Sequence, residues 1–237
     1  MKTLRQFTMA RVGLGRAGNS VPTRELLDFQ LAHARARDAV HFPFDAPALR
    51  NEIEAAGLTA VVVKSAARDR AEYLRRPDLG RRLDPESRLS LQALQSDIDV
   101  SFVIADGLSA LAVHRHALPL LQSVGAHKKS PIVVVEQGRV AIGDEIGELL
   151  KAALTVVLIG ERPGLSSPDS LGVYLTWSPR VGRTDAERNC ISNIRTGGLS
   201  PETAAMMLLL LMAGARALKL SGFNLRVPQQ LQMNRTE

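Results

Sequence analysis

The feature that most constrains the fold is a series of short apolar runs, each separated from the next by a longer segment with different spacing. Five runs rich in Val, Ile and Leu lie at residues 59–64, 100–105, 132–136, 155–159 and 171–176. Strands of this length that are apolar on both faces are typical of a parallel sheet covered by helices. The segments 85–95, 108–124 and 143–152 have helical spacing and are long enough to connect parallel strands.

This alternation predicts an α/β fold. Because crossovers between parallel strands are nearly always right-handed, we expect a Rossmann-like, mostly parallel sheet flanked by helices on both faces. The pattern changes near Gly57: before it lie two helical segments, 23–40 and 48–56, joined by a proline-containing stretch. The sequence therefore predicts a small helical N-terminal region over residues 1–57 and a Rossmann-like domain over residues 58–237.

Two further helices are predicted from their boundary signals. Thr184 and Glu187 have the spacing of a capping box, which predicts a helix that continues through Cys190. Ser200 is followed by a proline and an acidic residue, the pattern of a helix N-terminus, and this helix is expected to run to about Leu220.

The composition excludes some classes of protein. The chain has 237 residues, of which 45% are hydrophobic and 23% charged, as in ordinary globular proteins. The longest apolar stretch, 204–215, is too short to span a bilayer, so no membrane partner is expected. The single cysteine, Cys190, excludes an internal disulfide and fits a reducing compartment. We expect a soluble cytoplasmic protein.

The net charge of +6 raises the question of nucleic-acid binding. The densest arginine segment, residues 68–88, contains five acidic residues and one aromatic, Tyr73. A nucleic-acid surface more often has an unopposed basic stripe or several aromatics spaced for bases. We therefore expect an intramolecular or subunit-facing arginine network. A basic, nucleic-acid-binding Rossmann-like protein is kept as the alternative function.

The segment from Gly13 to Gly18 matches G-x-G-x-x-G, and Asp38 follows at the distance of a ribose-binding acid. A dinucleotide site also needs a buried strand before the glycines and a helix that starts within them. Residues 6–12 are barely apolar, and Pro22 and Thr23 place the helix start later. We expect a glycine-rich surface turn, and a nicotinamide oxidoreductase comes third among the functions considered.

Neither a metal site nor a catalytic residue is identified. His114 and His116 are two residues apart, so they diverge on a helix, and no cysteine or carboxylate pattern completes a ligand set. Cys190 has no identifiable neighbouring base, and a lone cysteine on a helix is usually a small buried hydrophobe.

Two acidic residues follow predicted strands directly. Asp106 ends the run 100–105, and Glu161 leaves the run 155–159 within Gly-Glu-Arg-Pro-Gly. In open α/β sheets, ligands bind beyond the carboxyl ends of the strands. Each acid can therefore face a ligand or serve as a capping or ion-paired group, and the residues alone leave both interpretations open.

The run from Gly160 to Leu171, GERPGLSSPDSL, resembles the small (light) chain of ethanolamine ammonia-lyase. Other segments resemble the same family in the same order: 11–18 (RVGLGRAG), 73–83 (YLRRPDLGRRL), 105–109 (ADGLS), 138–148 (GRVAIGDEIGE) and 189–198 (NCISNIRTGG). Together they extend over most of the chain.

The resemblance implies a carbon–nitrogen lyase that converts ethanolamine to acetaldehyde and ammonia by a radical mechanism, with adenosylcobalamin (coenzyme B12) as cofactor. It also implies a hetero-oligomer, in which the large (heavy) catalytic subunit holds the substrate and the small subunit covers the corrinoid at the interface. The sequence has no D-x-H-x-x-G motif. The cofactor is therefore expected to keep its own base as the lower cobalt ligand.

Three cobalamin contacts carry over from the family: Val140 in Gly-Arg-Val, Glu161 in Gly-Glu-Arg-Pro-Gly and Cys190 in Cys-Ile-Ser-Asn. For Glu161, the resemblance favours the ligand-facing interpretation. Many family members carry a longer N-terminal extension that targets a bacterial microcompartment. This sequence begins almost directly at the family-like core, so we expect a cytoplasmic location, and residence in a bacterial microcompartment is kept as the alternative.

Overall fold

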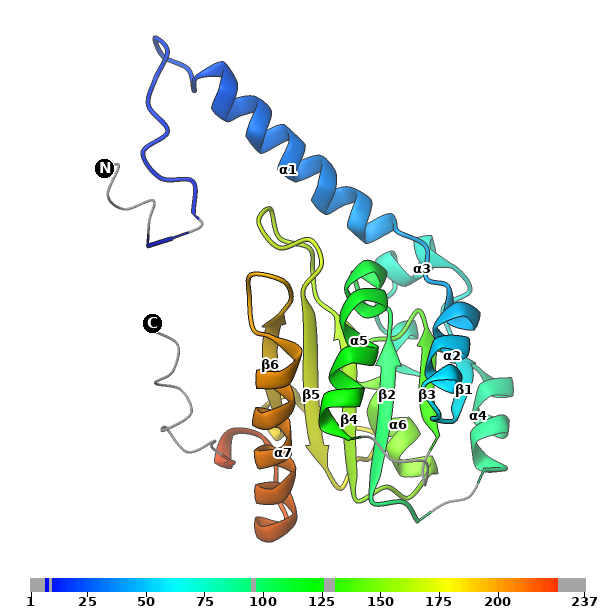
Figure 1. Cartoon of the computed structure of the whole chain (residues 1–237). Helices are drawn as coiled ribbons and strands as arrows, with labels where there is room; N and C mark the ends of the chain where they lie inside the picture. The colour runs from blue at the N-terminus through cyan, green and yellow to red at the C-terminus, as the bar shows by residue number, and fades with distance from the viewer. Residues whose placement is uncertain (1–6, 9, 95–96, 126–130, 226–237) are drawn as a thin grey trace.

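The computed structural model describes residues 7–8, 10–94, 97–125 and 131–225, and contains a six-stranded sheet (Figure 1). The strands are β1 (Ala60–Lys64), β2 (Val100–Ala105), β3 (Ile132–Glu136), β4 (Leu154–Gly160), β5 (Leu171–Trp177) and β6 (Arg188–Ile194). Their order is β1-β3-β2-β4-β5-β6. The first four run parallel, and β5 and β6 are antiparallel additions. All five predicted strands are confirmed, with ends that differ by at most one residue.

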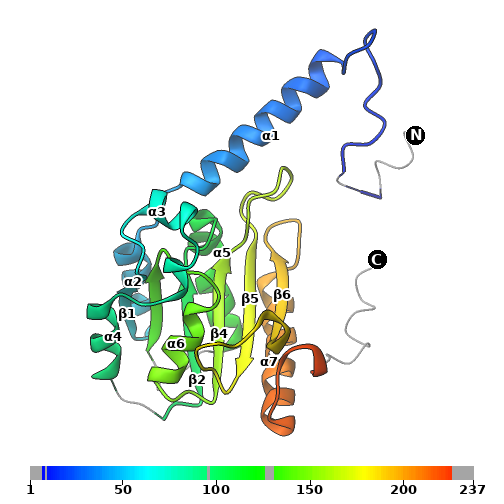
Figure 2. The same ribbon diagram turned by 180° about the vertical axis from the view of Figure 1, so that it is seen from behind.

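Helices cover both faces of the sheet. They are α1 (Thr23–His41), α2 (Ala46–Ala55), α3 (Arg70–Arg75), α4 (Pro85–Gln92), α5 (Ala110–Val124), α6 (Ile142–Leu149) and α7 (Pro201–Leu218). α2, α5 and α7 lie on one face, and α4 and α6 on the other (Figures 1 and 2). The predicted α/β class is confirmed. The strand order is neither 3-2-1-4-5-6 nor 2-1-3-4-5, so the Rossmann-like description stays a prediction.

The central strand β2 explains why the apolar runs are continuous. Every residue of β2 is buried. Phe102 and Ile104 pack in the core on the α5 side, whereas Val103 and Ala105 pack on the α6 side. A strand with helices on both faces cannot alternate apolar and polar residues, because either face would then bury polar groups.

The helix predicted from Thr184 through Cys190 is wrong. The capping box itself forms, since the Glu187 carboxylate accepts hydrogen bonds from the Thr184 amide at 2.7 Å and hydroxyl at 3.0 Å. It begins only the short 3-10 helix Asp185–Glu187, after which β6 pairs with β5. The free edge of β5 offers backbone partners, and Ile191 and Ile194 are buried in the core. This tertiary pairing overrides the local helix signal.

The helix predicted from Ser200 is confirmed, and it ends at Leu218 rather than near Leu220. Ser200 Oγ accepts a hydrogen bond from the Thr203 amide at 3.2 Å. By length and composition alone, α7 could cross a membrane, although 33% of its apolar segment is buried inside the domain. A core helix meets the same criteria, so the expected absence of a membrane partner stays a prediction.

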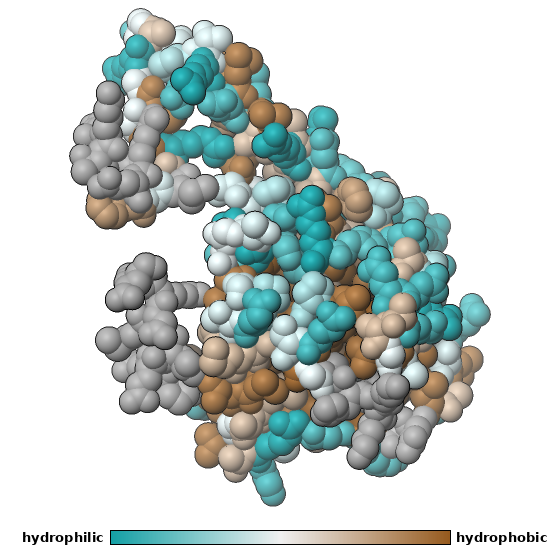
Figure 3. Space-filling model, in the orientation of Figure 1, coloured by the Kyte–Doolittle hydropathy of each residue, from teal (hydrophilic) through white to brown (hydrophobic). Residues whose placement is uncertain are grey.

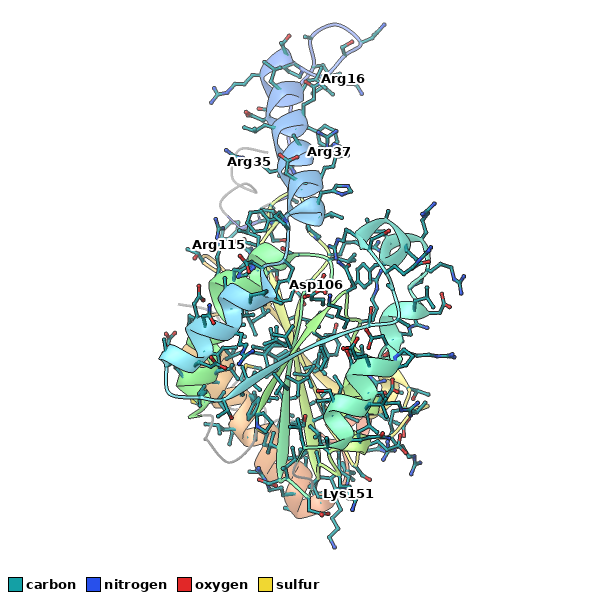
Figure 4. The ribbon with its side chains drawn as sticks, turned by 90° about the vertical axis from the view of Figure 1, so that its right-hand side faces the viewer. Arg16, Arg35, Arg37, Asp106, Arg115 and Lys151 are labelled. Atoms are coloured by element: carbon teal, nitrogen blue, oxygen red, sulfur yellow. The ribbon has the colours of Figure 1, made fainter. Side chains whose placement is uncertain are left out.

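The two N-terminal helices differ in their contacts with the sheet. α2 contributes Leu49 and Ile53 to the main core. α1 projects away from the body beyond the carboxyl ends of the parallel strands, and Ala39 is its buried residue (Figure 1). Figure 4 shows Arg35 and Arg37 along this helix and Arg16 near its far end. The boundary at residue 57 stays a prediction.

The segment Gly13–Gly18 lies in a surface loop that ends in a turn at Gly18 and Asn19, in agreement with the expected surface turn. Gly13, Gly15 and Gly18 have φ angles of 62°, 81° and 62°, and α1 begins only at Thr23. Asp38 lies on α1. The helix N-terminus that would meet a pyrophosphate is therefore separated from the glycines.

Asp106 lies at the carboxyl end of β2 and is 1% exposed (Figure 4). Its Oδ1 accepts a hydrogen bond from the Gly138 amide at 2.9 Å, and its Oδ2 accepts one from Arg70 at 3.0 Å. Arg70 also donates to the carbonyls of Gly107 and Val40, each at 2.8 Å. Of the two interpretations left open for Asp106, the structure supports the ion-paired one. This pair joins the end of α1, the end of β2 and the loop after β3.

Replacing Asp106 tests this arrangement through pH. Burial raises the pKa of Asp106 to about 7, although Arg70 and the Gly138 amide oppose the shift. An unfolded aspartate has a pKa of about 4. As pH rises from about 4 to about 7, the unfolded chain releases a proton that the folded chain keeps, so the contribution of Asp106 to the free energy of unfolding decreases. Below about pH 4 the stabilising contribution of Asp106 is fully present, and above about pH 7 it stays at its reduced value.

The Asp106→Asn variant lacks this titration. We expect the free energy of unfolding of the wild type, minus that of the variant, to fall between about pH 4 and 7 and then stay level. Urea unfolding of both chains at several pH values measures this difference. A difference that stays constant or rises across the window contradicts the prediction.

Candidate functional site

The three residues assigned by the resemblance surround one side chain, Tyr174 of β5. Tyr174 pairs with Val157 of β4 and with Cys190 of β6. Burial, the neighbouring Cys190 and the charge of Glu161 together raise the pKa of the Tyr174 hydroxyl. Tyr174 also lines a cavity with Val140. The structure thus brings Val140, Glu161 and Cys190 to one region of the sheet.

This region belongs to a face of β5 and β6 that helices leave uncovered. Leu171, Val173 and Leu175 are in the core under α7, so Gly172 and Tyr174 face the opposite way. Among the described α-helices, α4 and α6 cover the parallel half of the sheet on that side, and none lies over β5 and β6, whose lower ends are crossed only by the connection between them (Figure 2). An antiparallel strand needs no crossover helix, which leaves such a face open.

Tyr174 was missed in the sequence analysis, although a signal for it exists. The run 171–176 alternates large apolar residues with Gly172, Tyr174 and Thr176. The burial of the strand is almost continuous, with Tyr174 partly exposed. Such alternation indicates a strand with two unlike faces.

Glu161 follows β4 and contacts both neighbouring strands. Its amide donates to the Ser170 carbonyl at 2.9 Å, which closes the start of the β4–β5 connection. Its Oε2 accepts hydrogen bonds from the Ser170 hydroxyl and from the Asn193 amide, the latter at 3.3 Å. Within the described part of the chain, no hydrogen bond reaches Oε1. One carboxylate oxygen is therefore held by the fold, and the other is free to accept.

The position of Glu161 depends on a glycine in the adjacent strand. A Cβ atom added to Gly172 would lie 2.9 Å from Glu161 Oε1 and 3.1 Å from its Cγ. The carboxylate therefore lies directly over the bare backbone of β5. Any side chain at this position would displace it, at little cost to the core, because the displaced atoms are the end of a flexible side chain.

Cys190 lies on strand β6 and is exposed, so the expectation of a buried cysteine on a helix is wrong in both respects. Neighbouring protein atoms remove part of the hydration of the thiolate and raise the pKa of the thiol. A hydrogen bond with Tyr174 opposes this shift, and the charge of Glu161 adds to it. The thiol therefore stays protonated near neutral pH and is a weak nucleophile.

Val140 lies in the loop between β3 and α6, and this loop is held at three points. The Gly138 carbonyl accepts a hydrogen bond from the buried hydroxyl of Tyr73 at 2.9 Å. The Arg139 amide donates to the Gly80 carbonyl at 2.7 Å, and the Gly138 amide donates to Asp106. The half-buried side chain of Val140 is thus positioned by the core rather than by solvent-exposed contacts.

A cavity of about 870 Å³ lies beside Val140 and Tyr174, between α6 and the segments 77–82 and 181–185. Six arginines and four carboxylates line it: Arg81, Arg82, Arg88, Arg139, Arg183, Arg188, Asp78, Asp144, Glu145 and Asp185. Arg188 donates to both oxygens of Asp144, at 3.2 and 2.7 Å, and both side chains are buried. This ion pair fixes the start of β6 against α6.

Part of the arginine-rich segment 68–88 forms the intramolecular network that its interleaved charges predict. Arg68 pairs with Glu72 at 2.9 Å, and Arg76 pairs with Asp78 at 2.8 Å. His114 takes part in a hydrogen bond of the fold, because its Nε2 accepts the Asp45 amide at 3.2 Å.

Comparisons with known proteins identify the family of the chain. The family model described as ethanolamine ammonia-lyase light chain matches residues 1–226. The ethanolamine ammonia-lyase small subunit of Pseudomonas aeruginosa (strain LESB58) is 57% identical over 239 residues, which covers 97% of this chain and 88% of the relative.

Two other relatives carry the same name. The protein of Azotobacter vinelandii is 57% identical over 233 residues, or 94% of this chain and 86% of its own length. The protein of Pseudomonas fluorescens (strain Pf0-1) is 55% identical over 244 residues, which cover 99% of this chain and 89% of the relative. The resemblance found in the sequence is thereby confirmed, and the chain belongs to the ethanolamine ammonia-lyase light-chain family.

Proposed function

We propose that this chain is the small subunit of an ethanolamine ammonia-lyase, which with a large subunit converts ethanolamine to acetaldehyde and ammonia. The observation that carries the proposal is the family match over residues 1–226, together with relatives of that name at 57% identity. The words "small subunit" in the names of those relatives imply a large partner.

We further propose that the open face of β5 and β6 holds adenosylcobalamin, with Val140, Glu161 and Cys190 against it. The groups on this face fit a corrinoid, whose rim carries amide side chains. Glu161 Oε1 is a free acceptor for an amide N–H, and Val140 and Tyr174 offer apolar surface. When bound, the cofactor supplies a carbon-centred radical by homolysis of its cobalt–carbon bond. The residues of this chain bind and orient the cofactor and exclude water from it.

Exposed apolar side chains support the proposal that a large partner subunit binds this chain. On α1, Leu26, Leu27, Phe29 and Leu31 are exposed, and on α7 Met206, Leu209 and Leu210 are exposed. Figure 3 shows apolar residues at the surface of both regions. Side chains of this kind, gathered on two helices, are typical of surfaces that another protein covers. We propose that the large subunit covers them.

Activity should require both subunits. We expect the purified chain alone to release no ammonia from ethanolamine, because the residues that the structure describes offer no nucleophile–base pair and the radical chemistry belongs to the cofactor. Adding the large subunit and adenosylcobalamin should restore turnover. Turnover by the isolated chain would overturn the proposal.

The free oxygen of Glu161 should contribute to cofactor affinity. A charge-assisted hydrogen bond contributes about 1.5–3 kcal/mol, so Glu161→Ala should raise the dissociation constant for cobalamin by one to two powers of ten. Glu161→Gln keeps one acceptor and should lose less. Absorbance titration of the assembled enzyme measures both constants.

Gly172→Ala is the matched control, because it changes the position of the Glu161 carboxylate without changing its chemistry. It leaves Glu161 in the sequence but pushes the carboxylate off the strand. We expect a loss of cobalamin affinity comparable to that of Glu161→Gln, with the thermal unfolding midpoint nearly unchanged. Unchanged affinity in both Gly172→Ala and Glu161→Ala would exclude a cofactor contact at this carboxylate.

Cys190 should act through shape. A protonated thiol is a weak donor, so Cys190→Ala and Cys190→Ser should keep turnover with a modest loss of affinity. Cys190→Trp should block cofactor seating, because the side chain stands on the open face of the strand. If Cys190→Ala abolishes turnover while cobalamin still binds normally, the thiol has a chemical role that we do not assign to it.

A further inference from the structure

Three arginines of the cavity beside Val140 have no acidic partner. Within the described residues, no ion pair or hydrogen bond reaches the guanidinium groups of Arg81, Arg82 and Arg139. The other arginines of the cavity are each engaged by a carboxylate, as in Arg88 with Glu145 at 3.4 Å.

The carboxylates of the cavity are also each paired with an arginine other than these three. Asp78 pairs with Arg76 at 2.8 Å, and Arg188 contacts Asp144 at 2.7 Å and Asp185 at 3.5 Å. The Arg76 hydrogen bond, with a smaller contribution from the charge of Arg82, lowers the pKa of Asp78 to about 2 despite some desolvation. These carboxylates are therefore already paired with other arginines, and the free guanidinium groups of Arg81, Arg82 and Arg139 leave an excess of positive charge in the cavity.

The fold places these three side chains together from distant segments. The Arg139 amide donates to the Gly80 carbonyl at 2.7 Å, immediately before Arg81 and Arg82. A Cβ on Gly80 would lie 2.9 Å from Arg139 Cγ, so the Arg139 side chain crosses the bare backbone of this turn. Arg139 also stacks 4.3 Å above the Tyr73 ring, and its Nε is buried without a hydrogen-bond partner.

We propose that Arg81, Arg82 and Arg139 form a phosphate-binding subsite in this cavity. Guanidinium groups match the spacing of phosphate oxygens and form strong paired hydrogen bonds with them. Resting on the proposed function, we identify the phosphate as the phosphodiester in the nucleotide tail of cobalamin, because Val140 follows Arg139 directly and lines the same cavity. A free phosphate ion is the other source of the same chemistry.

The first experiment tests the subsite without the cofactor. The thermal unfolding midpoint of the full chain is measured in inorganic phosphate and in chloride at equal ionic strength. We expect phosphate to raise the midpoint of the wild type above its value in chloride, and this difference to disappear in the double variant Arg81→Gln, Arg82→Gln. Both side chains are exposed, so the fold should persist.

Arg75→Gln is the control. Arg75 is an exposed arginine of the same region that donates only to the Ala71 carbonyl of its own helix, at 3.2 Å, and does not line the cavity. This variant should keep the wild-type difference. Equal midpoints in phosphate and chloride for the wild type, or an undiminished difference in the double variant, would overturn the subsite.

The second experiment identifies the source of the phosphate. The complex of both subunits is titrated with cobalamin and with cobinamide, which lacks the nucleotide tail. We expect the double variant to bind cobalamin about ten- to a hundredfold more weakly and cobinamide as the wild type does. Arg139→Lys, which keeps the charge, should lose less cobalamin affinity than Arg139→Gln.

Each result has a separate meaning. If the variants lose cobalamin and cobinamide affinity equally, or lose neither, while the phosphate effect disappears, the subsite takes free phosphate and our choice of source is wrong. A wild-type complex that binds no cobalamin at all contradicts the proposed function, and the phosphate measurement still decides whether the subsite exists.

Discussion

The buried pair of Arg70 and Asp106 is the interaction on which the rest of the arrangement depends. An aspartate that is 1% exposed at a strand end needs both a cation and hydrogen-bond donors, and it receives them from Arg70 and the Gly138 amide. Because Arg70 also donates to the Val40 carbonyl, and Asp106 accepts from the Gly138 amide, the pair positions both the projecting α1 and the loop that carries Val140. The proposed partner surface on α1 and the proposed cofactor contact at Val140 therefore depend on the same ion pair.

The change from parallel to antiparallel pairing at β4 creates the open face. Each parallel strand is reached by a crossover that brings a helix onto the sheet, whereas β5 and β6 follow through short connections. The sheet thus gains two strands whose side away from α7 carries no α-helix, between the cavity and the end of β4. We propose that the cofactor lies against this surface.

The features that could be predicted from the sequence are those that depend on local interactions along the chain. The strands β1 to β5 were found because burial on both faces forces continuous apolar residues. β6 was missed because its pairing with β5 is tertiary, and the local capping box of Thr184 and Glu187 indicated a helix. The site residues came from family resemblance, and no local pattern predicts that Gly80 and Arg139 meet. Only the fold shows that Gly172 leaves room for Glu161.

Glu161 and Arg139 share one physical property, which is preorganisation. One oxygen of Glu161 is held by Ser170 and Asn193, and Arg139 is held by stacking on Tyr73. Ordering these side chains is therefore completed during folding, and less conformational entropy is lost when a ligand binds. The groups left unpaired are a carboxylate oxygen and guanidinium N–H groups, which recognise amide donors and phosphate oxygens respectively. A ligand that carries both amides and a phosphodiester can satisfy the whole face at once.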